Sequence, residues 1–459
     1  MDNVLTILYC IMCLCMFAYN YMKYGKILNA LNVYLIVWLL MVLCYNMKLI
    51  LYYDLTALTW ILIFASTVLV FLGYRLGSRI KAIGKRTTET EDASDGAFNE
   101  RSLKKIIIIT SLISMVAIVP NTLLLIQRYG INLLSKTNQI YYDNIAGGAP
   151  FSIPYLAAFA QVSCVFAGMY FAKYGFRLII ALPIALAMIS ILPSGSRGWL
   201  LLTVFLFLYP AVFFKNPVPY NVKVMRRKMN KNRLFKKKLI LIFSMTIILA
   251  LFLVLTINRS RDIDPELYNY LDSKMYEITR TTPWITKLYQ YFASPIGVLN
   301  SFLQEPEFYF GKNTFSVIYN FLNKFGFDID YSRYQDFYNI PIKTNVGTWI
   351  RELVQDFNIV GMLIVIFVFS VLVGYYDKKA RRYKQKDDVL LATVLDTILT
   401  MSFFVWYLRE GTMAVIILSC IIIKVFRKRK YIIKVDNAVS RNGTINQPVT
   451  HSTERSDKQ

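Results

Sequence analysis

Long apolar runs separated by short polar stretches dominate the chain. Residues 239–258, for example, contain no charged side chain. A helix needs roughly 20 apolar residues to span about 30 Å of hydrocarbon. Runs of this kind predict an all-α, polytopic membrane helical bundle with about eleven transmembrane helices. These lie near residues 3–20, 30–47, 55–77, 106–127, 151–172, 178–192, 199–214, 239–257, 357–376, 389–407 and 411–426.

The polar stretches divide the chain into four parts. Residues 1–257 are expected to form an N-terminal bundle of about eight spans, and 351–430 the C-terminal spans. Residues 431–459 read as a flexible tail. Between the two bundles, residues 258–350 form a long segment rich in Tyr, Phe and Trp, in which 313–325 carry apolar residues at helical spacing. Loops of this length are usually ordered and functional. This one could bind sugar rings or simply pack onto the bundle, and the sequence leaves both open.

The net charge of +24 suggests nucleic-acid binding until the basic residues are placed on the spans. They collect in alternate loops, and residues 215–238 contain ten basic side chains and no acidic one. Basic loops face the cytoplasm and contact lipid headgroups. We therefore expect a multi-pass protein of the bacterial cell membrane that contacts membrane lipids and no nucleic acid. Its N-terminus would lie outside the cell, its C-terminus in the cytoplasm, and the 258–350 segment outside.

One external turn carries candidate chemistry. Arg197 lies in the sequence Pro-Ser-Gly-Ser-Arg-Gly between two short predicted spans, which places the turn near the depth of lipid phosphates. The guanidinium is a fixed fork of donors that matches phosphate oxygens, and Ser194 and Ser196 add hydroxyl donors. We expect Arg197 to bind a lipid-linked diphosphate. The alternative is an arginine that only anchors the span at the interface.

These residues, together with three later segments, resemble the Wzy-type oligosaccharide repeat-unit polymerases, which assemble O-antigens, capsules and exopolysaccharides. The later segments are 291–302, 311–322 and 344–361. The family pattern in the last segment is an Asn, a Thr a few residues on, then Asp-Phe-Gly and a further Gly that opens a span. This chain matches it at Asn345, Thr348, Asp356, Phe357 and Gly361, with Asn358 in place of the usual Gly.

The resemblance implies a glycosyltransferase that moves a growing glycan from undecaprenyl pyrophosphate onto a hydroxyl of a new lipid-linked repeat unit. Arginines would stabilise the negative charge on the departing pyrophosphate, so no metal and no cofactor is expected. A general base would be a carboxylate, because the only histidine, His451, lies in the tail. The predicted catalytic residues are Arg197, Arg351, Arg261, Asp356 and Glu352, with Asp262 and Asp264 as further carboxylates. The predicted substrate-binding residues are Ser194, Ser196, Asn345, Thr348 and Arg409.

Other functions remain open at this point. The Asp-x-Asp pairs at 262–264 and 328–330 could indicate a metal-dependent transferase, although so short a pattern arises easily by chance. A lipid-linked oligosaccharide flippase would carry more charged residues inside its spans, whereas the spans of this chain carry almost none. Asp396 is an ionisable residue inside a span, and we expect it to make a structural hydrogen bond or to reach the interface. A polysaccharide ligase would share both the arginines and the long loop. A polymerase would also work beside a flippase and a chain-length regulator.

Overall fold

The computed structural model describes residues 2–24, 29–80, 99–145, 154–191, 197–213, 265–329, 335–382, 386–423 and 425. The predicted span 239–257 and the tail 431–459 lie outside these ranges. So do Ser194, Ser196, Arg261, Asp262 and Asp264, as well as the side chain of Arg197.

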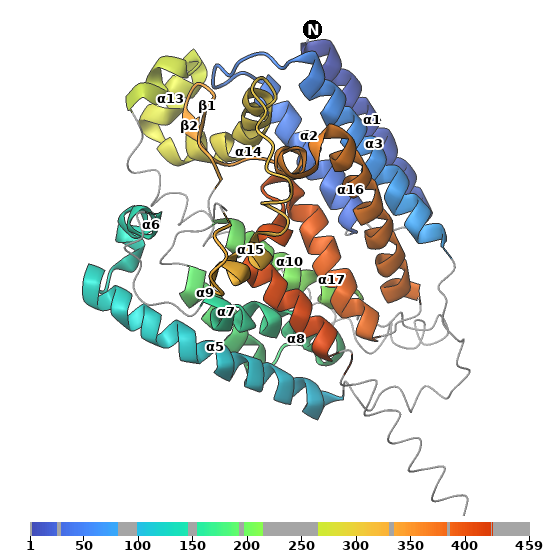
Figure 1. The fold of residues 1–459 in the computed structure, drawn as a ribbon, viewed down its shortest axis with the longest axis vertical. Coiled ribbons are helices and arrows are strands. Elements are labelled where there is room, and N and C mark those ends of the chain that lie inside the picture. The colour runs from blue at the N-terminus through green and yellow to red at the C-terminus, as the bar shows by residue number, and fades with distance from the viewer. Residues whose placement is uncertain are drawn as a thin grey trace, which may run out of the picture.

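Helices make up almost all of the described chain (Figure 1). The N-terminal part contains α1 (Asp2–Tyr24), α2 (Ala30–Asn46), α3 (Ala57–Arg79), α5 (Glu100–Tyr129), α6 (Thr137–Ile145), α7 (Pro154–Ala157), α8 (Phe159–Tyr174), α9 (Ala181–Ile191) and α10 (Arg197–Phe213). The later part contains α13 (Ser273–Thr281), α14 (Pro283–Phe302), α15 (Ser316–Asn323), α16 (Trp349–Arg382), α17 (Lys386–Thr400) and a last helix at Gly411–Ile423. Short 3-10 turns include η5 (Met401–Phe403) and η6 (Tyr407–Arg409), and β1 (Tyr338–Asn339) pairs antiparallel with β2 (Lys343–Thr344).

Five of the described helices are long and apolar enough to cross a membrane: Asp2–Lys23, Ala57–Arg79, Glu100–Tyr129, Tyr155–Tyr174 and Trp349–Arg381. Four shorter apolar helices, Ala30–Asn46, Leu178–Ile191, Gly198–Phe213 and Gly411–Ile423, coincide with further predicted spans. These findings confirm an all-α membrane protein. The number of eleven spans stays a prediction.

α3 and α16 pack side by side with their backbones in direct contact. A Cβ atom on Gly77 would lie 1.9 Å from the carbonyl oxygen of Val371, and one on Gly374 would lie 2.1 Å from that of Tyr74. Gly73 approaches Phe367 in the same way. The Gly73-x-x-x-Gly77 spacing is the small-residue pattern that lets membrane helices approach closely. This contact fixes α16, and with it the residues at the start of that helix, against the N-terminal bundle.

Part of the long aromatic segment packs onto the bundle at the end where the N-terminus lies (Figure 1). The Tyr289 hydroxyl of α14 donates to the carbonyl of Cys44 at the end of α2. Asn300 accepts from the backbone N–H of Thr56 at 2.9 Å and from the Thr59 hydroxyl at 2.7 Å. One of the two alternatives for this segment, packing onto the bundle, is therefore observed for α14.

α16 consists of two helical pieces. Asn358 separates them with φ 61° and ψ 176°, and its Oδ1 accepts from the Ile359 N–H at 2.6 Å. This combination of φ and ψ is adopted almost only by glycine, so the backbone is strained at Asn358. The second piece, 359–382, corresponds to the predicted span 357–376. The first piece, 349–357, precedes it and carries Arg351, Glu352 and Asp356.

Asp396, in α17, differs from the expectation. Its side chain is fully buried, and neither carboxyl oxygen has a hydrogen-bond partner among the described residues. The expected structural hydrogen bond is therefore wrong for this residue, and its approach to the membrane interface stays a prediction.

Candidate functional site

Arg351 is the central residue of a group of buried polar side chains at the start of α16. Only 1% of it is exposed. Within the described chain its Nε and Nη1 atoms have no hydrogen-bond partner, and no carboxylate forms an ion pair with it. The centre of the Tyr338 ring lies 5.5 Å from its Cζ atom, and the side chain passes close over Gly347, where a Cβ would lie 2.9 Å from Nε. A buried guanidinium thus presents two N–H groups without an acceptor.

Other donors in the same segment share this condition. Gln355 lies four residues after Arg351 in α16, which places the two on one face of the helix, and Thr348 directly precedes the first residue of that helix. The Thr348 hydroxyl, the Gln355 Nε2 and the Trp349 Nε1 are buried and have no partner among the described residues. A buried polar group without a partner costs about 1–3 kcal/mol. The segment is therefore suited to a ligand with several acceptor oxygens.

Next to Arg351 in the sequence, Glu352 forms a buried ion pair with Arg409 of η6. The same carboxylate accepts from the Gln335 amide at 2.7 Å and from the Trp406 backbone N–H at 2.5 Å. Burial disfavours the charged form of Arg409, but the contact with Glu352 outweighs it, so the pKa of Arg409 lies above its ordinary value. Glu352 thereby ties η6 and the segment before β1 to α16.

Asp356, one turn further along α16, accepts four hydrogen bonds from the turn that precedes α15. The donors include the backbone N–H of Asn313 at 2.9 Å and the backbone N–H and hydroxyl of Thr314, both at 2.6 Å. The Trp406 indole in turn donates to the Thr314 hydroxyl at 3.0 Å. Glu352 and Asp356 therefore both hold surrounding segments in place, and neither is left as an unoccupied proton acceptor.

The backbone of Arg197 lies at the same end of the bundle. α10 begins at this residue, and a Cβ on the next one, Gly198, would lie 2.8 Å from the Phe404 ring and 3.2 Å from the Tyr407 hydroxyl. The Trp199 and Tyr407 rings meet edge to face, with 5.9 Å between their centres. Since Tyr407 is two residues from Arg409, the opening turn of α10 borders the segment that carries the buried ion pair.

The structure thus brings together five of the predicted site residues: Thr348, Arg351, Glu352, Asp356 and Arg409. Asn345 is half-buried on the approach to α16. The residues that connect this group were not predicted from the sequence; they are Asn313, Thr314, Gln335, Tyr338 and Trp406. Two of them, Asn313 and Thr314, lie in the 311–322 segment that carries the family resemblance, which was the available signal.

The chain has no match among family models, curated proteins or solved structures. The site is therefore interpreted from its own geometry. Within the described ranges no three His, Cys, Asp or Glu side chains are placed to hold a metal ion. What the described residues do offer is one buried guanidinium and neighbouring donors without acceptors, held by two carboxylates that are already satisfied.

Proposed function

We propose that this protein polymerises undecaprenyl-pyrophosphate-linked oligosaccharide repeat units into a surface polysaccharide. It would transfer the growing glycan to a new lipid-linked unit at the outer face of the membrane and release undecaprenyl pyrophosphate. The observation that carries the proposal is the buried Arg351, whose Nε and Nη1 lack partners among the described residues and which shares one helix face with Gln355, just after Thr348.

The reaction places negative charge where these donors lie. The bond between the anomeric carbon of the donor glycan and its pyrophosphate oxygen breaks, and the acceptor hydroxyl oxygen bonds to that carbon. The hydroxyl proton leaves, and the pyrophosphate gains the electron pair. Pre-positioned donors stabilise such a developing charge, each by a factor of about 10²–10³ in rate. Arg351 is pre-positioned by its burial, by Gly347 and by the Tyr338 ring.

The described geometry narrows the choice of proton acceptor. Glu352 and Asp356 are occupied by hydrogen bonds, so in this proposal they position the site. Of the carboxylates considered from the sequence, Asp262 and Asp264 remain. Glu307 and Asp336 are added to them, because both are exposed beside the Tyr309 hydroxyl, at 2.5 and 3.4 Å.

Two further observations support the family relationship on which the proposal draws. Asn358 adopts a positive φ at the position where the family pattern has Gly, so the backbone there has the conformation that a glycine would favour. Asn313 and Asp356, from two segments that carry the resemblance, are hydrogen-bonded to each other. Eleven spans, an external N-terminus and an external 258–350 segment belong to the same proposal.

The test compares lipid-linked saccharides in membranes of a host that makes the cognate repeat unit. The samples are wild type, a deletion, Arg351→Met and Arg197→Ala, at matched expression. A ladder of repeats in wild type that collapses to a single lipid-linked unit in the deletion and in Arg351→Met supports the proposal. Persistence of the ladder in Arg197→Ala would show that Arg197 only anchors its span.

Two other outcomes identify the alternatives. Single units trapped on the cytoplasmic face in the deletion would indicate a flippase. A full lipid-linked ladder in the deletion, with loss of transfer to the final acceptor, would indicate a ligase.

A further inference from the structure

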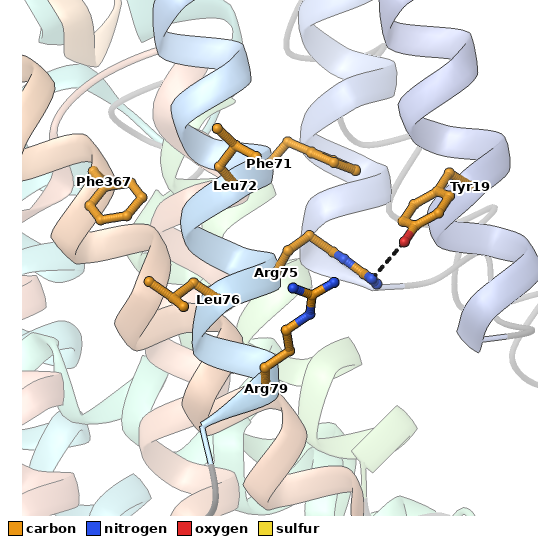
Figure 2. A pocket seen from close by; sticks show the side chains of 7 residues that line it. All are labelled: Tyr19, Phe71, Leu72, Arg75, Leu76, Arg79 and Phe367. Atoms are coloured by element: carbon orange, nitrogen blue, oxygen red, sulfur yellow. Dashed lines mark hydrogen bonds between the residues drawn. The ribbon is translucent and has the colours of Figure 1, made fainter.

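A cavity of about 480 Å³ lies between α1, α3 and α16, beside the last turns of α3 (Figure 2). Two arginines from the last turns of α3 line it. Arg75 is 5% exposed, donates to the Tyr19 hydroxyl at 2.9 Å and has its Cζ 4.7 Å from the centre of the Tyr19 ring. Arg79 is exposed. None of the lining residues is acidic.

The remaining walls of the cavity are apolar. They are formed by Phe71, Leu72, Leu76 and Phe367, and about half of the surface of Leu72 and of Leu76 is exposed. Figure 2 shows both guanidinium groups below Phe71 and Leu72. The cavity thus joins a cationic part to an apolar part that opens onto the surface of the bundle. A phospholipid is divided in the same way into a charged phosphate and apolar acyl chains.

Further positive charge lies around the two arginines. Lys23, at the end of α1, is within electrostatic range of Arg75, Arg79 and Lys378. The Lys378 ammonium donates to the backbone carbonyl of Ile80 at 3.0 Å, which places it at the end of α3. Like charges gathered in this way repel one another, and a bound anion relieves the repulsion. Arginine pairs also bind phosphate oxygens through their fork of donors.

We infer that this cavity binds the phosphate of an anionic phospholipid, with an acyl chain lying along Phe71, Leu72 and Phe367. The four cations favour an anionic headgroup over a zwitterionic one, whose ammonium they would repel. Basic residues between helices near the cytoplasmic surface attract anionic lipids in this manner. The inference does not depend on the proposed polymerase activity.

The experiment measures lipid binding to the purified full chain in detergent by native mass spectrometry. Phosphatidylglycerol and phosphatidylcholine with identical acyl chains are titrated in parallel, and inorganic phosphate is used as a competitor. The variants are Arg75→Gln, Arg79→Gln and, as a control outside the cavity, Arg101→Gln, which changes an exposed arginine at the start of α5. Arg79→Gln alters an exposed residue, so it tests the inference even if the buried Arg75 is needed for folding.

The expected result is tighter binding of phosphatidylglycerol, weakened about fivefold by each cavity variant and unchanged by Arg101→Gln. Equal binding of the two lipids would overturn the inference. An equal loss in Arg101→Gln would also overturn it, because the attraction would then be a general effect of surface charge. Displacement of the lipid by millimolar inorganic phosphate would show a site for soluble anions instead.

Discussion

Replacing Arg351 by Met separates catalysis from stability at the candidate site. Met has similar length and no charge, and it removes the Nε and Nη1 donors that have no partner in the described structure. Burying a charge without a partner costs free energy, and an apolar side chain of similar length removes that cost. We therefore expect the Tm of Arg351→Met to equal or exceed that of wild type. Activity should fall by about 10²–10³, the effect of removing one pre-positioned donor from a developing anion.

Arg409→Met is the matched comparison, since the same exchange is made at an arginine that is also buried but has a partner. Removing it leaves Glu352 charged and buried, which costs about 3–5 kcal/mol. The Tm of this variant should fall, and the double variant Arg409→Met/Glu352→Gln should recover part of the loss. Opposite effects on stability from two neighbouring arginines would be hard to explain by a general intolerance of substitution.

The assay has two readouts on the same purified variants. Thermal unfolding in a fixed detergent gives the Tm, and elongation of a lipid-linked repeat unit in proteoliposomes gives the rate. If Arg351→Met lowers the Tm as much as Arg409→Met does, Arg351 is a structural residue. If the rate of elongation is unchanged, the guanidinium takes no part in transfer and the reasoning about unpartnered donors is wrong.

Three further predictions follow from close contacts and buried groups. Gly347→Ala adds a Cβ 2.9 Å from the Arg351 Nε, so it should displace the guanidinium. The elongation rate should fall at least tenfold while the Tm changes little, and an unchanged rate would contradict the position assigned to the Arg351 guanidinium. Gly77→Ala inserts a Cβ 1.9 Å from the Val371 carbonyl oxygen, so α3 and α16 must separate. The Tm should fall by the equivalent of about 3 kcal/mol or more. Ile61→Ala, on the exposed face of α3, is the control. Asp396→Leu removes a buried carboxyl that has no hydrogen-bond partner among the described residues, and calorimetry should show an equal or higher Tm; a clear decrease would show that its attraction to Arg381 stabilises the fold.

The apolar pattern was sufficient to predict the helices because burial in a membrane constrains length and composition together. α1 and α3 begin and end within four residues of the predicted limits, whereas α5 begins six residues before and α8 eight residues after the predicted start. The break in α16 was not predicted, since a single Asn at positive φ leaves no periodic signal. The Gly73-x-x-x-Gly77 spacing is a pattern typical of closely packed membrane helices, and the contact between α3 and α16 could have been predicted from it.

Which residues belong to the candidate site could largely be predicted from the sequence, but the role of each residue could not. The sequence predicted that Arg351, Glu352, Asp356 and Arg409 belong to one site. It also offered two of them, Glu352 and Asp356, as possible general bases. Whether a carboxylate is free depends on partners remote in the sequence, such as Arg409, which lies 57 positions from Glu352. Hydrogen-bond satisfaction is a property of the folded arrangement. A one-dimensional pattern identifies polar residues near a site without showing which of them already have partners.

This distinction also answers the question that an arginine in a membrane protein raises, namely whether it anchors the fold or acts on a ligand. An anchoring arginine has its partner within the protein, as Arg409 has in Glu352, and stability is lost when it is removed. In the proposed function Arg351 acts on a ligand, because its Nε and Nη1 have no hydrogen-bond partner among the described residues. The fold tolerates that deficit because Glu352 and Asp356, which follow Arg351 in the same helix, fix the backbone through contacts of their own. The two carboxylates therefore make the unpartnered arginine possible, and in the proposed function the pyrophosphate of the lipid-linked donor completes the site.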